Sequence, residues 1–176
     1  MEEIFKIDGI QLMGDNLRNQ VKYIVEGVRI YTMCKIIHPE SAELDNNCQI
    51  MDFVFIDAGE LLKIGKFSTI TWHCIIEGGA KTYIGDRVFL GPGSKLLTST
   101  YELNGFYSVE HLPAGCGAIR YGDIIIEDDA YLGANVTVLP GVTIGEGAIV
   151  SANALVNKDL EQWGIYVGVP CKKIGE

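Results

Sequence analysis

The stretch "IGEGAIVSANALV", residues 144–156, places aliphatic residues six positions apart, at Ile144, Val150 and Val156. An amphipathic helix repeats its apolar residues every three or four positions, and a half-buried strand alternates them. A period of six fits neither element. The same period recurs along most of the chain, at Leu44, Ile50, Ile56, Ile64, Ile70, Ile76, Ile84, Leu90, Leu96, Ile126, Leu132 and Val138.

Three periods of six make a larger repeat. Ile126 and Ile144 are eighteen residues apart, whereas Leu44, Ile64 and Ile84 are spaced by twenty, as if a corner held two extra residues. This spacing predicts a three-sided coil in which each side is a short parallel strand paired with the coils before and after it. A second set of smaller residues, four positions after each start, is also expected to point inward: Cys48, Val54, Ser68, Cys74, Val88, Ser94, Thr100, Ala130, Val136, Val142, Ala148 and Ala154. We therefore predict an all-β solenoid, a parallel β-helix of hexapeptide repeats.

Both ends of the chain depart from the repeat. Residues 1–33 are expected to form a small N-terminal cap, with a helix that begins at Asp15 or Asn16 and covers the open first coil. Residues 34–176 form the solenoid domain, and after Lys158 the rhythm fades, so 159–176 is interpreted as a tail. The apolar face of the predicted helix consists of Leu17, Val21, Ile24, Val25 and Val28.

One long interruption separates Leu96 from Ile126. The segment "TSTYELNGFYSVEHLPAGCGAIRYGD", residues 98–123, is rich in Tyr, Gly and polar residues and predicts an extended loop over 101–122. The scaffold does not need such a loop to close its core, so a functional role is favoured. The alternative is a loop that only packs between subunits.

Composition argues against several classes of partner. The formal net charge of −9, without a basic stripe, disfavours nucleic acid. No apolar run is long enough for membrane insertion, and the opening Met1-Glu2-Glu3 lacks the basic start of a signal peptide, so we expect a cytoplasmic protein. The five cysteines contain no CxxC pair and are expected to be reduced packing residues: Cys34, Cys48, Cys74, Cys116 and Cys171.

Three segments carry a resemblance to a known family: "IGDRVFLGPG" at 84–93, "DDAYLGANVTVLPGVTIGEGAIVSANALVNKD" at 128–159 and "GVPCKKI" at 168–174. Together they resemble the hexapeptide-repeat acyltransferases, in particular galactoside and maltose O-acetyltransferases and the sugar-nucleotide N-acyltransferases of surface-polysaccharide pathways. The resemblance covers about Leu44 to Ile174. It implies a left-handed prism, a homotrimer, and acetyl-CoA or another acyl-CoA bound in the groove between two prisms.

The resemblance also implies a set of coenzyme contacts. Ala134 and Ala152 would offer backbone groups to the pantetheine arm, and Asn157 and Lys158 would contact its far end. Lys172 and Lys173, which follow Pro170, would lie near the phosphates, although a solvated tail is the alternative interpretation of these lysines.

The acceptor side departs from the O-acetyltransferase pattern. The loop histidine that acts there as general base corresponds to Tyr101, and the asparagine that orients the acceptor corresponds to Thr71. A sugar hydroxyl needs a positioned base, whereas an amine with a pKa near about 8 is already partly neutral. The missing histidine therefore favours an amine acceptor.

His73 is the leading candidate for the base or for a residue that orients the acceptor, and Glu102 is its alternative. In "ITWHCI", residues 70–75, Ile70 and Cys74 should point inward, which would leave Thr71 and His73 on the outer face. His38 precedes a proline and is interpreted as structural. The acceptor-binding set is completed by Trp72, Asn104, His111 and Tyr131.

Three hypotheses follow. The first is acyl transfer from acyl-CoA to the amine of a nucleotide-linked amino-deoxy sugar. The second is a sugar O-acetyltransferase. The third is a non-catalytic scaffold resembling the carbonic-anhydrase-like branch without its metal. A metal site is not expected, because His38, His73 and His111 do not recur at coil spacing.

Overall fold

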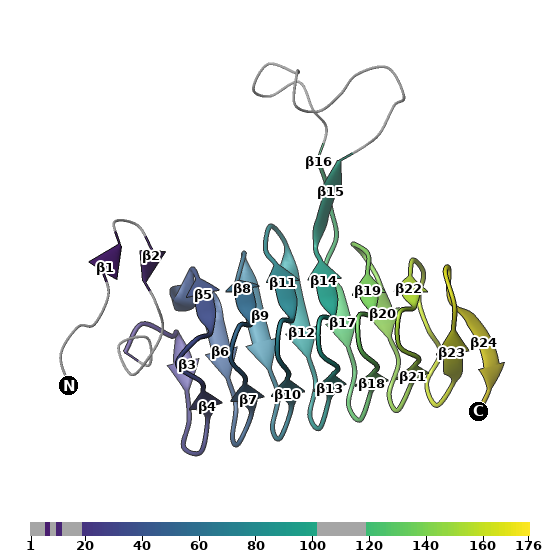
Figure 1. Ribbon diagram of the computed structural model, residues 1–176, viewed down its shortest axis with the longest axis horizontal. Helices are drawn as coiled ribbons and strands as arrows, with labels where there is room; N and C mark the ends of the chain where they lie inside the picture. The colour runs from purple at the N-terminus through teal and green to yellow at the C-terminus, as the bar shows by residue number, and fades with distance from the viewer. Residues whose placement is uncertain (1–5, 8–9, 12–18, 102–118) are drawn as a thin grey trace.

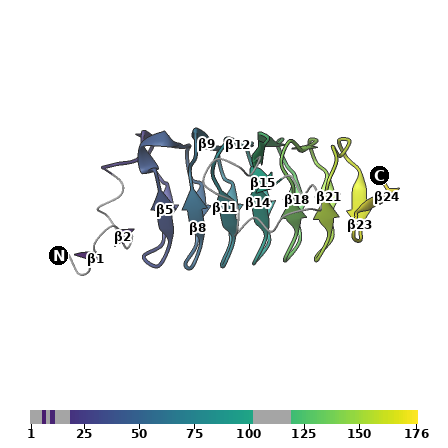
Figure 2. The same cartoon turned by 90° about the horizontal axis from the view of Figure 1, so that it is seen from above.

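The computed structural model describes residues 6–7, 10–11, 19–101 and 119–176. Apart from two short antiparallel pairs, β1 (Lys6–Ile7) with β2 (Ile10–Gln11) and β15 (Ser99–Tyr101) with β16 (Ile119–Tyr121), the described chain winds into a three-sided prism (Figures 1 and 2). Within these residues there is no α-helix, and one 3₁₀ turn, η1 (Pro39–Ser41), is present. We name the three sides sheets I, II and III, in the order in which the chain visits them.

Each sheet is a stack of short strands, one from each coil. Sheet I holds β3 (Tyr23–Ile24), β6 (Ala42–Leu44), β9 (Leu61–Ile64), β12 (Lys81–Ile84), β17 (Ile124–Ile126) and β20 (Thr143–Ile144). Sheet II holds β4 (Arg29–Ile30), β7 (Gln49–Ile50), β10 (Thr69–Ile70), β13 (Phe89–Leu90), β18 (Tyr131–Leu132), β21 (Ile149–Val150), β23 (Ile165–Val167) and β24 (Lys172–Gly175). Sheet III holds β5 (Lys35–Ile37), β8 (Phe55–Asp57), β11 (Ile75–Glu77), β14 (Lys95–Leu97), β19 (Thr137–Val138) and β22 (Leu155–Val156). All neighbours are parallel except β24, which returns antiparallel along β23.

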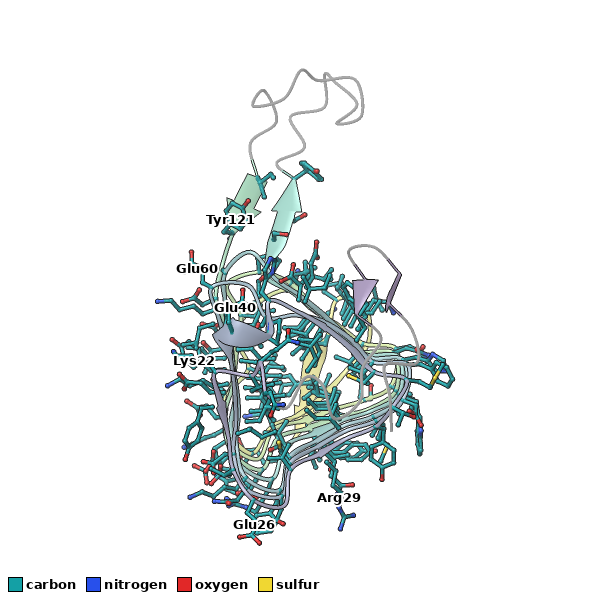
Figure 3. The ribbon with its side chains drawn as sticks, turned by 90° about the vertical axis from the view of Figure 1, so that its left-hand side faces the viewer. Lys22, Glu26, Arg29, Glu40, Glu60 and Tyr121 are labelled. Atoms are coloured by element: carbon teal, nitrogen blue, oxygen red, sulfur yellow. The ribbon has the colours of Figure 1, made fainter. Side chains whose placement is uncertain are left out.

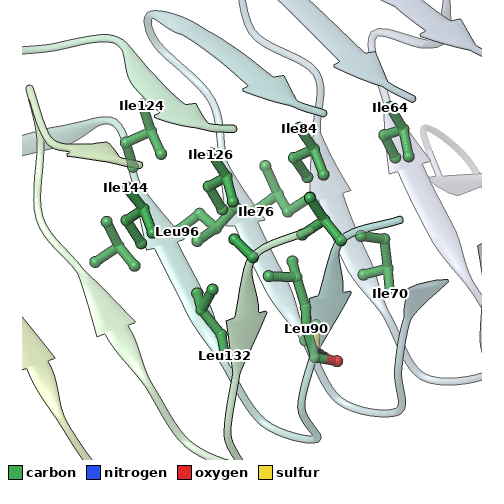
Figure 4. Close-up of a cluster of buried hydrophobic side chains, with 14 of the residues drawn as sticks. Ile64, Ile70, Ile76, Ile84, Leu90, Leu96, Ile124, Ile126, Leu132 and Ile144 are labelled. Carbon is green, nitrogen blue, oxygen red and sulfur yellow. Dashed lines mark hydrogen bonds between the residues drawn. The ribbon is translucent and has the colours of Figure 1, made fainter. Parts of the chain in front are cut away.

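The strand register places the aliphatic residues that are spaced six apart directly above one another in successive coils. Ile70, for example, pairs with Ile50 of the coil before and with Leu90 of the coil after. Every aliphatic residue of the first predicted set is at most 3% exposed, and together they fill the interior (Figure 4). The parallel solenoid predicted from the period of six is therefore confirmed, while its left hand remains an expectation from the resemblance.

The chain turns at three edges, which we call the I/II, II/III and III/I edges. At the II/III edge, successive coils place a residue with positive φ at the same point of the turn. This left-handed conformation is easy for Gly and tolerated by Asn and His, so at Phe53 the surrounding coil must impose it. Because these turns stack, their side chains form a row along the prism: Phe53 (φ 63°), His73 (61°), Gly93 (76°), Asn135 (58°) and Asn153 (61°).

The predicted N-terminal helix is wrong for the residues that the structure describes. The coil already begins at β3, and Val28 is 2% exposed in the core. Ile24, Ile30 and Ile36 continue the count of six twenty residues before the next coil. The described residues of the predicted helix face, Val21, Ile24, Val25 and Val28, therefore serve the prism instead. Asp15, Asn16 and Leu17 lie outside the described residues.

The coil also extends further at the other end. Leu160 forms a bridge with Ile144, and Tyr166 of β23 pairs with Val150. Both spacings are sixteen rather than eighteen, so a shortened corner hides the repeat in residues 159–176. Most of this predicted tail is therefore another coil, closed by β24.

The predicted loop leaves the prism at the III/I edge on two antiparallel strands, β15 (Ser99–Tyr101) and β16 (Ile119–Tyr121), which we call the stalk (Figure 1). It begins two residues before the predicted start at 101. Thr100, expected to point inward, is exposed on the stalk, because the chain departs directly after Thr98, which is fully buried. The rest of the loop, residues 102–118, lies outside the described part.

Four cysteines lie in the described residues, and all are free and buried, as expected: Cys34, Cys48, Cys74 and Cys171. Burial raises the pKa of the Cys34 and Cys48 thiols to about 12. A thiol that stays protonated is a poor nucleophile, so these residues serve packing. Cys116 lies outside the described residues.

Candidate active site

The described candidate residues gather mostly on the two edges that border sheet III. At the II/III edge, Gly93 N donates to Trp72 O (3.0 Å), and Asn153 N donates to Ala134 O (2.8 Å). Trp72, Ala134 and Ala152 thus hold the same position in their turns, and neighbouring coils are about 4.8 Å apart. Two of the predicted coenzyme contacts, Ala134 and Ala152, therefore share this edge with the acceptor residue Trp72.

His73 lies on this edge as an exposed residue, as expected from its sequence position. Its ring stacks on Phe53, with centroids 5.2 Å apart and planes 7° from parallel. Within the described residues its ring has no hydrogen-bond partner. A flat ring held by stacking suits the orientation of a substrate, and no carboxylate among the described residues orients the ring as it would a base.

The predicted outer-face position of Thr71 is wrong. Its side chain is 2% exposed, and Oγ1 donates to the Leu90 carbonyl oxygen (2.5 Å). The alternation of sides ends where the strand ends, and the turn carries this residue inward. Thr71 therefore supports the corner and cannot contact a substrate.

Tyr131 belongs to sheet II rather than to the edge. It is 47% exposed, and its ring stacks on that of Phe89 at 5.2 Å with planes 5° apart. The pair forms a flat aromatic surface beside the turn that contains Ala134. A planar group bound along this edge would find this surface next to it.

The III/I edge carries the stalk and further predicted contacts. Asn157 and Lys158 are exposed at this edge, directly after β22. Tyr101 is 49% exposed at the end of the described stalk. Glu102, Asn104 and His111 lie outside the described residues, so their predicted roles stay predictions.

The stalk is anchored firmly at its base. Thr98 Oγ1 donates to Glu77 O (2.7 Å) and accepts from Ala80 N (3.3 Å). Gly122 N donates to Thr98 O (3.0 Å), which joins the two ends of the excursion. On Gly122 a Cβ would collide with the Gly141 backbone, so only glycine fits this close approach.

The two lysines of the C-terminal segment differ. Lys173 Nζ lies 2.9 Å from Glu161 Oε2 and 2.8 Å from Glu176 Oε1. These contacts raise the pKa of Lys173, so its ammonium stays charged, and the two carboxylates balance that positive charge. Lys172 is exposed and forms no ion pair with the described residues. Pro170, two residues before it, is also exposed. Lys172 is thus the better placed of the two for a phosphate.

His38, which the sequence pattern led us to interpret as structural, forms a polar pair at the III/I edge. His38 Nδ1 lies 2.8 Å from Asp57 Oδ1 at the III/I edge. The carboxylate raises the pKa of His38, mainly through this hydrogen bond. The two residues are nineteen positions apart, close to one coil of twenty, so a search for polar pairs at coil spacing would have found them.

A hollow of about 700 Å³ lies elsewhere, over sheet I. It contains none of the predicted site residues, and Lys63 is its one lining cation among the described residues. Its carboxylates would repel the phosphates of a coenzyme, which favours sheet III and its edges for that ligand. These carboxylates are Glu43, Asp45, Asp86, Glu127, Asp128 and Glu146.

Two absences concern the alternative functions. Within the described ranges, no group of three or more His, Cys, Asp or Glu side chains is placed to hold a metal ion. In the same part of the chain, no helix has the length and apolarity needed to cross a membrane.

Comparison with protein families agrees with the solenoid. Residues 123–158 match the model of the bacterial transferase hexapeptide (six repeats). A Schizosaccharomyces pombe protein named as an acetyltransferase is 37% identical over 119 residues, which is 67% of this chain and 54% of its own length. A Staphylococcus aureus protein named as an acetyltransferase is 37% identical over 118 residues, 67% of this chain and 56% of its own. The chain thus spans little more than half the length of these relatives.

Solved structures match more of the chain. The N-acyltransferase AntD from Bacillus cereus, in complex with dTDP and 3-hydroxybutyryl-CoA, is 25% identical with a TM-score of 0.82. The match covers 96% of this chain and 90% of AntD. The hexapeptide-repeat acetyltransferase VCA0836 from Vibrio cholerae is 25% identical with a TM-score of 0.61, covering 90% of this chain and 75% of its own.

Proposed function

Because this chain belongs to the hexapeptide-repeat transferase superfamily, we propose that it is an acyl-CoA-dependent N-acyltransferase. Its acceptor is the amine of an amino-deoxy sugar linked to a nucleotide. The observation that carries this proposal is the likeness to AntD over 96% of the chain with a TM-score of 0.82. AntD is an N-acyltransferase, and another of its structures contains dTDP-4-amino-4,6-dideoxyglucose and coenzyme A.

The reaction replaces the C–S bond of the thioester by a C–N bond and moves one proton from nitrogen to sulfur. The neutral amine nitrogen attacks the thioester carbonyl, and a tetrahedral intermediate collapses to an amide while the C–S bond breaks. The amine loses a proton, and the coenzyme leaves as a thiol. Tyr101 stands where the related O-acetyltransferases have their loop histidine, and an amine needs less help from a base than a hydroxyl does.

The edges of sheet III would hold the two substrates. Ala134 and Ala152 offer the backbone of the II/III edge to the pantetheine arm, and Lys158 and Lys172 are exposed cations for the phosphates. His73, stacked on the same edge, orients the acceptor. Glu102 remains the alternative on the loop.

The proposed protein is a cytoplasmic homotrimer in which two chains enclose each site. Light scattering in dilute buffer is expected to give three times the monomer mass. A monomer that retains activity would contradict the shared site.

The decisive experiment compares acceptors. Purified protein is incubated with acetyl-CoA or 3-hydroxybutyryl-CoA and with matched pairs of nucleotide sugars that differ only by an amino or a hydroxyl group. Free thiol is followed, and the product is identified by mass spectrometry. We expect thiol release with the amino member and an added acyl group on its nitrogen.

Two other outcomes would replace the proposal. Release only with hydroxyl acceptors would make the protein a sugar O-acetyltransferase. Absence of acyl-CoA binding by calorimetry, together with absence of thiol release, would favour a non-catalytic β-helix scaffold.

A further inference from the structure

The His38 and Asp57 pair is built so that one histidine nitrogen stays available. Asp57 Oδ1 accepts from Gly59 N (3.0 Å) and contacts His38 Nδ1 (2.8 Å). An ionised carboxylate can only accept hydrogen bonds, so Nδ1 carries the proton of the neutral imidazole. Nε2 then presents a lone pair, as the base of a catalytic dyad does.

The backbone fixes the pair in place. His38 has φ 55°, in the left-handed region, and is followed at once by the short turn η1. Asp57 belongs to the coil after that of His38, and the Gly59 amide of the same coil donates a hydrogen bond to its carboxylate. Two neighbouring coils therefore set the position of the imidazole, the first through the His38 backbone and the next through Asp57.

The pair lines a hollow of about 430 Å³ at the III/I edge. Besides His38 and Asp57, its walls include Glu40, Glu60 and the backbone of Gly79. A volume of this size lies within the range of about 300–1,000 Å³ found for small-ligand sites. Three carboxylates attract an ammonium group and repel a diphosphate, so the charge of this hollow suits the amine end of an amino sugar.

The hollow lies at the foot of the stalk. A Cβ on Gly79 would meet Tyr121 Cε1 at 2.8 Å, so the stalk residue Tyr121 packs directly on one wall of the hollow. Glu40, Glu60 and Tyr121 lie on the same edge of the prism when it is viewed from its end (Figure 3). Asn157 and Lys158 follow further along this edge.

We propose that His38, oriented by Asp57, is the catalytic base of the acyl transfer and that this hollow receives the acceptor amine. The proposal rests on the proposed function. The incoming ammonium is held by the carboxylates and gives one proton to His38 Nε2, which passes it on to water. The neutral nitrogen then attacks the thioester carbon, its second proton moves to His38 Nε2, the C–S bond breaks, and the imidazolium gives this proton to the departing thiolate.

The pH dependence follows from the groups around the ring. The hydrogen bond and charge of Asp57 raise the pKa of His38 above the usual 6.5, and Glu40 adds to this effect. Glu60 also faces the hollow. A base must be unprotonated, so activity should fall as the pH drops through this raised pKa.

The test uses His38→Gln and Asp57→Asn in the full-length protein, with Asp129→Asn as the matched control. Asp129 is a carboxylate that pairs with Arg87 at 2.6 Å on the I/II edge, away from the hollow. We expect His38→Gln to lower kcat with an amino sugar nucleotide by about 100-fold or more, and Asp57→Asn to lower it by about 10-fold or more. Asp129→Asn should stay within about 2-fold of the parent, and calorimetric binding of CoA should be unchanged in all three.

Two readouts separate catalysis from a structural role. The acidic limb of the pH–rate profile should move to lower pH in Asp57→Asn, because the amide no longer stabilises the imidazolium. NMR titration of His38 should show the same downward shift, and this measurement does not require activity. Thermal melts check that each variant is folded, and Asp57→Asn carries the test if His38→Gln is not.

The failures are distinguishable. If the parent acylates the amine while folded His38→Gln and Asp57→Asn remain within about 3-fold of it, the dyad is not the base and the proposed function stands. If the parent transfers no acyl group to any amine, the proposed function falls and this inference falls with it.

Discussion

Three consecutive isoleucines in β17 provide a direct measurement of which side of a strand faces the core. Ile124 and Ile126 are 0% and 1% exposed, whereas Ile125 between them is 38% exposed on the outer face of sheet I. Replacing an isoleucine by alanine removes three carbons, worth about 2.4 kcal/mol of transfer free energy at about 0.8 kcal/mol for each. The same substitution therefore has different effects at adjacent positions.

At Ile126 the full transfer free energy is lost and a cavity is added. Ile84 and Ile144 hold the same position in the neighbouring coils, so the site cannot collapse easily. We expect Ile126→Ala to lower the free energy of unfolding by about 3–4 kcal/mol. Ile125→Ala loses roughly 1.5 kcal/mol in proportion to its burial and leaves no enclosed cavity.

Thermal and urea unfolding followed by circular dichroism, at one protein concentration, would measure the difference. A gap of about 2 kcal/mol corresponds to roughly 4–8 °C in Tm for a chain of this length. The urea m-value should stay constant if only stability changes. Equal losses, or a larger loss at Ile125, would refute the assignment and indicate that the outer face of sheet I is buried against another molecule.

Further substitutions address the stalk and the candidate site. Thr98→Val leaves the buried Ala80 amide without its acceptor and should lower the free energy of unfolding, measured in urea, by about 1–3 kcal/mol. Thr137→Val, on the outer face of sheet III, is the control and should lower it less. Equal losses would contradict the anchoring role of Thr98. Lys172→Ala should raise the KM for acyl-CoA several-fold in steady-state assays and leave kcat nearly unchanged. Lys173→Ala should change this KM less, because two carboxylates already balance the charge of Lys173. A larger rise in KM for Lys173→Ala than for Lys172→Ala would place the phosphates beside Lys173. His73→Asn should raise the KM for the acceptor and leave the acidic limb of the pH–rate profile in place, because its ring orients the substrate; loss of that limb would restore it as the base.

The fold was largely predictable because a single physical rule repeats in every coil. A residue such as Ile70 must lie between its counterparts in the coils before and after, so a period of six appears directly in the sequence. At the N-terminus the same rule was obscured, since Val21, Ile24 and Val28 fit a helix face as well as a coil. At the C-terminus a shorter corner displaced Tyr166 from the expected count.

The site was less predictable because its contacts cross between coils. The side that Thr71 faces depends on where its strand ends and the turn begins, and alternation alone gave the wrong answer. His38 gains its partner only when the next coil brings Asp57 within 2.8 Å. Residues that a resemblance points to, such as Ala134 and Ala152, were easier to place, since their position in the turn follows from the repeat.

The join between stalk and prism has an evolutionary consequence. Because Thr98 and Gly122 are hydrogen bonded to each other, the excursion enters and leaves the coil at a single point. A segment attached in this way can be lengthened, shortened or exchanged between related proteins while every coil keeps its register. Substrate preference and the prism can then diverge separately. Grafting residues 99–121 onto a related prism would transfer the substrate preference without any redesign of the prism.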